Sequence, residues 1–335
     1  MSALALLGGY GADLALGDPR RFHPVAGFGK IAATAERIAY RPTKLRGLLL
    51  CGALVGGSAA AAELLARRGP IEREALLAVV IWGSVAGHSL RAEAARIAAL
   101  TTQNDLSEAR HELRSLCGRD ATGLDQDELA CGIVESLAEN SSDAVVGALL
   151  WAALAGPAGA VGYRAANTLD AMWGRRDQRY GEFGFAAAKL DDLLNLIPAR
   201  LTALLCALCA PLVGGSPIET LRTVRRDAAT HPSPNAGVVE AAFAGALGLQ
   251  LGGPLSYSGH PEERPRLGSG PRPTVTDVER AIKLSRTVCT LAALCCAALR
   301  GGLTRTRPKD PAHARAGSPQ ASTLLAGGGR QCSDS

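Results

Sequence analysis

Aromatic residues are scarce in this chain of 335 residues, at 4% of the total. Base stacking on single-stranded nucleic acid depends on aromatic side chains. The net charge of +5 is modest, and the basic residues are spread over every polar segment, whereas a nucleic-acid-binding protein gathers them on one face or in one run. We therefore expect no nucleic-acid partner.

The common catalytic and metal-binding motifs are also missing. The sequence has no Gly-x-x-x-x-Gly-Lys-Ser/Thr phosphate loop and no dinucleotide fingerprint, and it has no Gly-x-Ser-x-Gly nucleophile turn. Among the nine cysteines, Cys206 and Cys209 have redox or metal spacing, but no second Cys or His pair accompanies them. We interpret the cysteines of the apolar segments as small packing residues.

Long apolar blocks are what the sequence does contain. A bilayer core of about 30 Å requires about 20 mostly apolar helical residues. We predict an all-α, polytopic integral membrane protein with five or six hydrophobic helices and polar helical loops. The alternative is a soluble protein with buried helices, which the shorter blocks allow. The blocks comprise residues 3–16, 47–66, 75–90, 144–163, 199–215 and 284–303.

The first block is interpreted as a retained span, because it lacks a basic flank and contains Asp13, unlike a cleavable signal peptide. The membrane domain is predicted to cover residues 1–303. Residues 304–335, rich in Gly, Ser, Pro and Arg, are predicted to form a disordered tail. Loop 17–46 is the most basic short loop, so we place it in the cytoplasm and the N-terminus outside.

Four polar blocks lie beside the apolar ones. In the first, Pro19 and Pro24 are expected to end a helix and hold an extended turn. His23 on that stiff turn is a candidate substrate-binding residue, whereas Asp18 is interpreted as a helix-end residue.

The second block covers residues 135–143. In a helix, Ser136, Asn140 and Asp143 share one face, and Glu139 lies four residues before Asp143. Like charges at that spacing repel unless a cation or basic group lies between them. The alternative is a capping cluster at 140–142 that opens a helix at Ala144.

The third block covers residues 164–198. Asn167 and Asp170 share a helix face, as do Lys189 and Asp192. This mixture of oxygens and cations suits a phosphate bound with a hard divalent ion. A solvated helical hairpin with surface ion pairs is the alternative.

The fourth block includes Arg226 and the turn that starts at His231. Ser233 or Asn235 can cap a helix that begins near Ala236. A helix N-terminus beside Arg226 and His231 is a plausible anion site, and capping alone is the alternative.

In this order and between these apolar blocks, the four segments resemble the signatures of the CobD/CbiB family over residues 3–303. The resemblance implies adenosylcobinamide-phosphate synthase activity in a bacterial cell membrane. Aminopropanol or its phosphate amidates a propionate carboxyl of adenosylcobyric acid, with ATP and Mg²⁺ as cofactors and other cobalamin-pathway enzymes as possible partners. The matching segments are Gly17-Asp18-Pro19 with His23-Pro24-Val25, 135–143, Asn167-Thr168-Leu169-Asp170, Gly181-Glu182-Phe183-Gly184, Lys189-Leu190-Asp191-Asp192, and Arg226-Asp227 with His231-Pro232-Ser233-Pro234-Asn235-Ala236-Gly237.

A free carboxylate is a poor electrophile and needs activation, for example as an acyl phosphate, which a cation-rich site would stabilise. Residue type suggests the roles within these positions. Catalytic candidates are Glu139, Asp170, Lys189 and His231, with Glu139 or His231 as base for the amine. Lys189, Arg226 and His231 are candidates for holding phosphate. The expected substrate-binding residues are His23, Asn140, Asn167, Arg226, Ser233 and Asn235, and the expected Mg²⁺ ligands are Asp143, Asp170, Asp191 and Asp192.

Two other functions remain open at this point. Intramembrane polar residues also mark the pathways of transporters, so a corrinoid carrier is one alternative. A non-catalytic membrane scaffold for soluble cobalamin enzymes is the other.

Strict alternation of spans would place the third polar block across the membrane from the other three. All four can share a site only if one apolar block does not cross. Block 144–163 contains Gly156-Pro157 in its middle, and we predict that it forms a re-entrant hairpin buried in protein.

Overall fold

The computed structural model describes residues 2–19, 23–117, 121–175, 177–257 and 260–305. The predicted tail from residue 306 onward lies outside the described residues, as do Arg20 and Arg21 of the basic loop.

The elements of the first half are α1 (Ser2–Leu16), α2 (Pro24–Ala39), α3 (Lys44–Ala66), α4 (Pro70–Ser84), α5 (Gly87–Thr102), α6 (Leu106–Leu116), α7 (Gln126–Asn140), the π-helical turn η1 (Ser141–Val146) and α8 (Gly147–Trp173). Those of the second half are α9 (Phe185–Leu194), α10 (Leu196–Cys209), η2 (Ala210–Val213), α11 (Pro217–Asp227), η3 (Ala228–Thr230), α12 (Ala236–Leu247), β1 (Leu251–Tyr257), β2 (His260–Leu267) and α13 (Val275–Arg305).

Within the described residues, five helical segments are long and apolar enough to cross a membrane, and each overlaps a predicted block. The prediction of an all-α polytopic protein is confirmed. α3 shows the expected lipid-facing character, because only 11% of its apolar window is buried inside the protein. The segments are Lys44–Ala66, Pro70–Thr102, Gln126–Trp173, Leu196–Val213 and Val275–Leu303, with α1 and α12 as shorter apolar helices.

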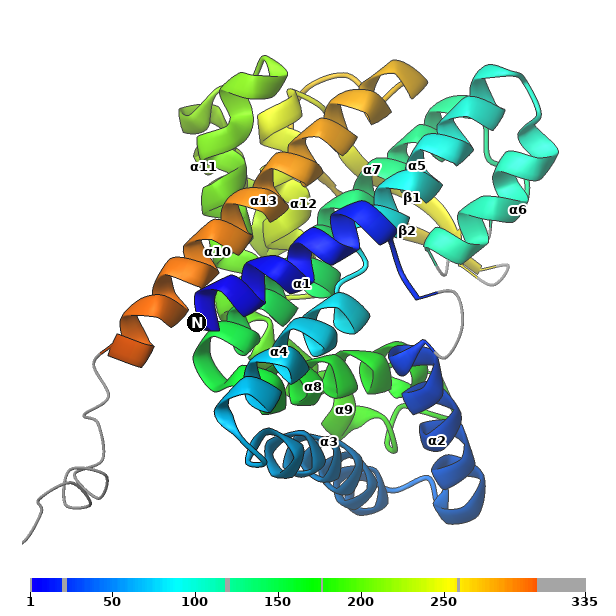
Figure 1. Cartoon of the computed structure of the whole chain (residues 1–335). Coiled ribbons are helices and arrows are strands. Elements are labelled where there is room, and N and C mark those ends of the chain that lie inside the picture. Colours follow the sequence, from blue (N-terminus) through cyan, green and yellow to red (C-terminus); the bar gives the residue numbers. More distant parts are fainter. Residues whose placement is uncertain (1, 20–22, 118–120, 176, 258–259, 306–335) are drawn as a thin grey trace, which may run out of the picture.

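The helices form two layers around α8 (Figure 1). α2 and α3 lie on one side, where Trp173 and Phe183 fill a small core. On the other side, α5, α7, α10, α12 and α13 build the largest core, with Phe243 buried in it. α1 and α4 pack with α8 and α13 in a third core around Tyr10 and Ile81.

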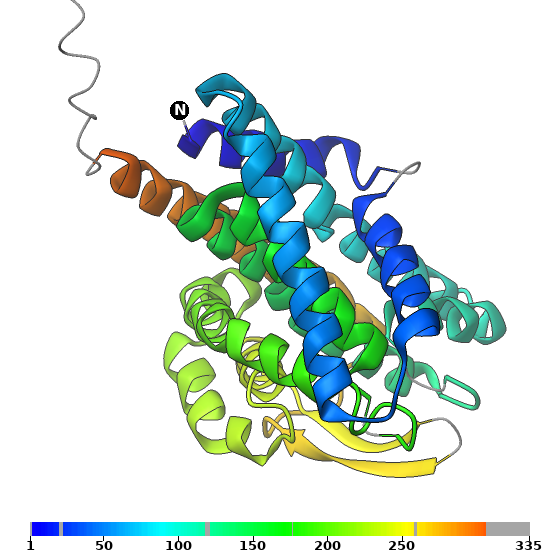
Figure 2. The ribbon, with the colours of Figure 1, turned by 90° about the horizontal axis from the view of Figure 1, so that it is seen from below.

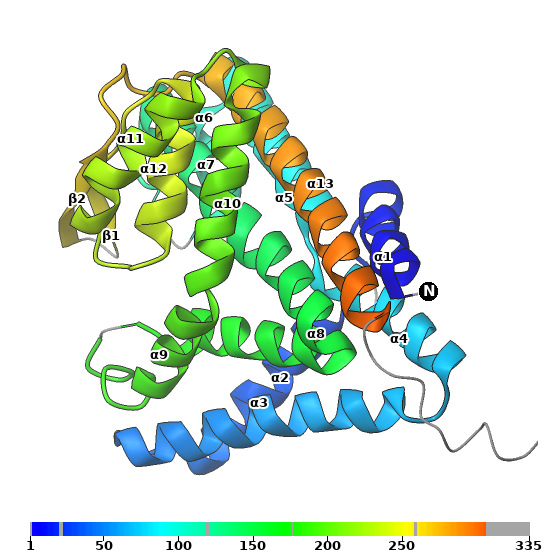
Figure 3. The same cartoon turned by 90° about the vertical axis from the view of Figure 1, so that its left-hand side faces the viewer.

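The helix of α8 is broken at Gly156, whose φ of 67° and ψ of −150° are rarely accessible to any residue but glycine. Pro157 follows and has no backbone N–H to donate. The chain therefore reverses here, and Figure 3 shows α8 returning toward α9 after it leaves α7.

Contacts between the two arms confirm the reversal. A straight helix would hold positions 147 and 163 about 24 Å apart at about 1.5 Å per residue. Instead, a side chain at Gly147 would collide with the Tyr163 hydroxyl, and this hydroxyl donates to the Asp143 carbonyl at 2.9 Å. The block predicted as a hairpin is thus folded as a helical hairpin, and both of its ends lie at the same side of it.

A β-hairpin follows α12, in a Pro/Gly-rich stretch to which the sequence analysis assigned no strand. β1 and β2 pair antiparallel, with a register shift between Leu251 and Gly253, and they extend below the helices in Figure 2. Two carboxylates anchor its backbone. Glu135 Oε1 accepts from the Gly252 N–H at 2.8 Å, and Asp227 Oδ2 accepts from the Gly268 N–H at 2.7 Å.

Candidate functional site

A cavity of about 260 Å³ lies where α7, α8, α9 and the start of α12 meet. We call it the acidic cavity, because five carboxylates line it and no Lys or Arg does among the described residues. Such a cavity attracts a cation or a protonated amine. The lining residues are Glu139, Asp143, Asp170, Gly174, Ala188, Asp191, Asp192, Asn195, Pro232, Ser233, Asn235 and Ala236.

The helical hairpin brings two of these carboxylates together from distant positions. Asp143 lies in η1, before the first arm, and Asp170 lies near the end of the second arm. Within the described part of the chain, neither carboxylate accepts a hydrogen bond, so both oxygens of each remain available to a ligand. The structure therefore brings four acids into one cavity, as predicted: Asp143, Asp170, Asp191 and Asp192.

The helix does not end before Asp143. α7 continues through η1 into α8, and Asn140 donates to the Ser136 carbonyl at 3.0 Å instead of capping a new helix. The capping interpretation of residues 140–142 is wrong for this reason. Single π-helical turns of this kind are frequent at functional sites.

Asp191 is held rigidly at the floor of the cavity. Its Oδ1 accepts from Asn167 Nδ2 at 3.2 Å, and its Oδ2 accepts from Asn195 Nδ2 at 3.0 Å. The Tyr163 hydroxyl lies 2.7 Å from Asn195 Oδ1, so its one proton is shared between that oxygen and the Asp143 carbonyl. Burial raises the pKa of Asp191, and the hydrogen bonds from the two asparagines offset part of that rise. Asn167 thus holds Asp191 in place through this hydrogen bond and does not itself line the cavity.

A second pocket, of about 550 Å³, adjoins the acidic cavity and shares Gly174, Ala188 and Asp192 with it. We call it the charged pocket, because cations and carboxylates alternate around it. Lys189 Nζ lies 3.3 Å from Asp192 Oδ2. Exposed ion pairs of this kind contribute about 0–1 kcal/mol, so an incoming anion can replace the carboxylate. The cations are Lys44, Arg175 and Lys189, and the carboxylates are Asp177, Glu182 and Asp192.

Glu36 of α2 fastens the loop that forms this pocket. Its buried carboxylate accepts from Trp173 Nε1 at 2.9 Å, Arg179 Nη2 at 2.8 Å and the Tyr180 hydroxyl at 3.0 Å. Burial raises the pKa of Glu36, but these three hydrogen bonds outweigh burial and leave the pKa lowered. Glu36 is not recognisable from the sequence, because its partners lie far away in the chain.

Ser233 and Asn235 enter the acidic cavity from the turn before α12. α12 begins at Ala236 as predicted, and Asn235 occupies its N-cap position without a capping hydrogen bond from its side chain. Ser233 Oγ accepts from the Ala236 N–H at 3.2 Å. Asn235 ties three helices together: its Nδ2 donates to the Asp192 carbonyl at 2.8 Å and its Oδ1 accepts from Arg200 at 2.6 Å.

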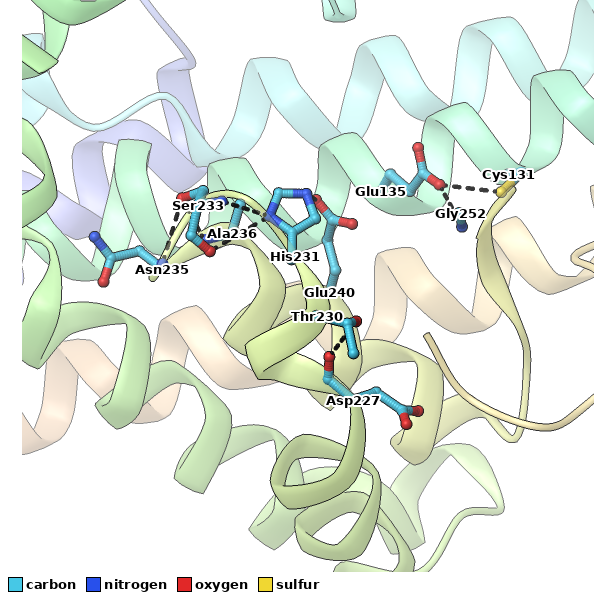
Figure 4. Close-up of polar contacts among 10 residues, drawn as sticks. All are labelled: Cys131, Glu135, Asp227, Thr230, His231, Ser233, Asn235, Ala236, Glu240 and Gly252. Carbon is cyan, nitrogen blue, oxygen red and sulfur yellow. Dashed lines mark hydrogen bonds and ion pairs between the residues drawn. The ribbon is translucent and has the colours of Figure 1, made fainter. Parts of the chain in front are cut away.

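His231 and Arg226 do not reach the acidic cavity, so this part of the prediction is wrong. Figure 4 shows His231 directed toward Glu240 of α12, with Nε2 3.8 Å from Glu240 Oε1 and both side chains buried. His231 Nδ1 accepts from the Ser233 N–H at 3.0 Å. The tight turn therefore points Ser233 into the cavity and His231 into the protein.

Arg226 is held by its neighbour. Its Nε and Nη2 form a bidentate pair with Asp227, at 2.6 and 2.7 Å. Hydrogen bonds from Arg226, together with the Gly268 N–H, lower the pKa of Asp227 despite partial burial. This pair anchors the β-hairpin and leaves the anion site predicted beside α12 without its arginine.

His23 also lies away from the cavity. It precedes α2, and its Nδ1 accepts from the Val25 N–H at 3.2 Å, while Nε2 lies 3.8 Å from Asp18. Of the expected substrate-binding residues, only Ser233 and Asn235 line the acidic cavity.

Residues 6–285 match the protein family described as CobD/Cbib protein. This chain belongs to the CobD/CbiB family. It is 48% identical over 296 residues to "Cobalamin biosynthesis protein CobD" of Mycobacterium tuberculosis H37Rv, covering 87% of this chain and 94% of the relative. The protein of the same name from Chromobacterium violaceum is 42% identical over 281 residues, covering 81% and 88%. That of Rhodobacter capsulatus is 41% identical over 287 residues, covering 82% and 90%. No solved structure matches the chain.

The acidic cavity of this CobD/CbiB protein fits a magnesium ion in its chemistry. Mg²⁺ prefers carboxylate oxygens, keeps several waters and completes its shell with substrate phosphates, so one or two protein carboxylates suffice. Among the described residues, no group of three or more His, Cys, Asp or Glu side chains is close enough to hold a metal by itself. The arrangement suits an ion that arrives with a phosphate substrate.

Four polar residues of the site region have no predicted role: Tyr163, Arg164, Asn195 and Arg200. Each acts through a partner from another helix or from the next turn of its own helix. The only local signal was that each lies at an edge of an apolar block, where a polar residue is costly unless it serves a purpose.

Proposed function

We propose that this protein is an acid–amine ligase of cobalamin biosynthesis in the cell membrane. It joins the amino group of aminopropanol, or of its phosphate, to a propionate carboxyl of adenosylcobyric acid. The observation that carries the proposal is the acidic cavity, where five carboxylates meet without a lining Lys or Arg among the described residues. At neutral pH the amine substrate is a cation, and this cavity suits it.

Glu139 is the carboxylate best suited to take a proton from the amine. The amine attacks a carboxyl carbon only after it loses a proton, and a general base must lie at the site to accept that proton. Glu139 lines the cavity and is exposed, so the proton can pass on to water. Asp143 is left to balance the positive charge of the amine before its deprotonation.

The charged pocket supports a role for a phosphate group. In aminopropanol phosphate, the positive ammonium group and the negative phosphate group lie a short distance apart. One molecule could therefore reach into both pockets, because they meet at Asp192. Lys44, Arg175 and Lys189 would then face the phosphate, in place of the Arg226 and His231 expected from the sequence.

ATP and Mg²⁺ would supply activation of the carboxylate when bound. Asp170 and Asp192 would hold the ion, and water and substrate phosphate would complete its shell. Asp191, with both oxygens engaged by amide donors, would instead fix the geometry of α8 against α9.

A corrinoid carrier is the second candidate, and the broken helix at Gly156 favours it. Interrupted helices inside apolar segments are typical of transporter binding sites. The carrier hypothesis requires movement of the corrinoid without chemical change.

One experiment separates the two functions. Purified protein in lipid vesicles is given adenosylcobyric acid, aminopropanol phosphate, ATP and Mg²⁺, and the corrinoids are analysed by mass spectrometry. We expect the mass of the amide product, and none with Asp170→Asn. Uptake of corrinoid at unchanged mass would favour the carrier and contradict the ligase.

A further inference from the structure

A second cleft, of about 280 Å³, lies beside the acidic cavity at the junction of α7 and α8. Glu139 and Asp143 line the acidic cavity, and their chain neighbours Asn140 and Ala144 line this cleft. Because successive helix residues point about 100° apart, the two spaces are neighbours around one helix. We call the second space the Arg164 cleft, after the one Arg or Lys that lines it among the described residues.

The guanidinium of Arg164 is incompletely paired. Nη1 donates to Asn167 Oδ1 at 3.0 Å, whereas Nε is buried and has no hydrogen-bond partner within the described ranges. In that same part of the chain, no carboxylate lies within ion-pair distance of Arg164. The carboxylates of Asp18, Asp143 and Asp191 act on its charge only from beyond ion-pair distance. A guanidinium has five N–H donors, and a charge that is partly buried without a direct ion pair is costly. Arg164 thus has both charge and donors to offer an anion.

The acid at the rim of the cleft does not neutralise Arg164. Glu93 Oε1 accepts from Arg96 Nη2 and from Ser115 Oγ, each at 3.3 Å. Glu93 is therefore engaged by Arg96 of α5 and Ser115 of α6. The rest of the lining is small or apolar, apart from the hydroxyls of Ser89 and Ser115 and the side-chain amide of Asn140.

We propose that the Arg164 cleft binds the carboxylate of the acid substrate, with Arg164 as its counter-ion. The proposal rests on the proposed ligase function and assigns a subsite to the second substrate. The planar guanidinium matches a carboxylate through two parallel hydrogen bonds, and the apolar lining suits the methylene groups of a propionate arm.

This assignment gives each substrate a space of the opposite charge. The amine is attracted to the acidic cavity and the acid to the Arg164 cleft, so neither competes for the place of the other. Asn167 connects the two, because it accepts from Arg164 and donates to Asp191.

The test measures binding and does not depend on turnover. The full chain in detergent is dialysed to equilibrium against adenosylcobyric acid or its primary amide, and bound corrinoid is read by absorbance. For wild type we expect the acid to bind about tenfold more tightly than the amide, as one charged pairing allows. In Arg164→Gln the two should bind alike, Arg164→Lys should restore part of the preference, and Arg222→Gln, an exposed arginine of α11, should keep it.

Ser89→Trp provides a variant that leaves Arg164 in place and fills the cleft; we expect it to lose acid binding. An unchanged preference for the acid in Arg164→Gln or Ser89→Trp would overturn the proposal. Displacement of the acid by inorganic phosphate but not by propionate would overturn the carboxylate assignment.

Failure of the ligase function gives a different result. Arg164-dependent acid binding without any amide product would refute the ligase and keep the subsite. Normal product formation, together with acid binding that is the same with and without Arg164, would keep the ligase function and refute the subsite.

Discussion

The Glu36 carboxylate accepts a 2.9 Å hydrogen bond from the indole of Trp173, 137 residues further along the chain. This contact joins α2 to the end of the helical hairpin. Through Arg179 and Tyr180, the same carboxylate also holds the loop of the charged pocket. A single buried acid thus fixes the position of a pocket that it does not line.

Glu36→Gln should destabilise the protein by about 1–3 kcal/mol at neutral pH, because hydrogen bonds to a charged acceptor are stronger than those to an amide. Since the folded pKa of Glu36 is lowered, its contribution is fully present above the ordinary glutamate pKa and disappears as the pH falls through the lowered value. Tryptophan fluorescence during thermal unfolding in detergent measures this. The difference in unfolding free energy between wild type and Glu36→Gln should disappear at low pH. Glu182 is an exposed acid, so the control variant Glu182→Gln should be as stable as wild type at every pH.

Asp170→Asn and Asp192→Ala should lower the rate of amide formation by about 10²-fold or more, because each removes charge where the amine and ion are expected. Membrane insertion should not change, since both side chains are only partly buried. Product formation by mass spectrometry and membrane content by immunoblot measure the two effects. Glu219→Gln on the surface of α11 is the matched control, and wild-type turnover in the Asp192 variant would remove the cavity from the mechanism.

Cysteines placed at Arg114 and Arg175 should react with a membrane-impermeant maleimide from the same side. Arg114 precedes α7 and Arg175 follows α8, and the hairpin between them returns to its starting side. The experiment uses a background without native cysteines, with right-side-out and inside-out vesicles compared. Labelling from opposite sides would mean that the acidic residues cannot meet in one cavity.

Gly156→Ala should lower stability by about 1–3 kcal/mol, because a backbone at φ 67° is strained for any residue with a Cβ. The new Cβ would also lie 3.2 Å from Arg300 Nη2. Gly52→Ala in α3 is the matched control, since nothing lies within 4 Å of its added Cβ and alanine favours a helix. Equal melting temperatures for the two variants would show that the break at Gly156 is not required.

The fold was largely predictable because its main signals are local. Apolar blocks are visible in the sequence whatever their partners are, and Gly156-Pro157 announces a break by backbone chemistry alone. Two of the five expected acids meet for the same reason: once block 144–163 doubles back, Asp143 and Asp170 must approach each other.

The errors arose where direction depends on a distant partner. Spacing places His231 beside Ser233, but the buried Glu240 of α12 decides that its ring points inward. The β-hairpin was missed because Glu135 and Asp227, acids outside the hairpin, hold its glycine N–H groups. Arg164 lies at the edge of an apolar block, and the cleft beside it could not be predicted because α5 and α6, which are distant in the sequence, form part of its lining.

The close contact of Gly147 with Tyr163 makes the two arms of the hairpin a single mechanical unit. Long spans such as α3 tilt when the surrounding bilayer becomes thicker or thinner, but the distance from Asp143 to Asp170 is set inside the protein by that contact. The geometry of the acidic cavity should therefore be insensitive to lipid chain length, even where the outer helices respond to it.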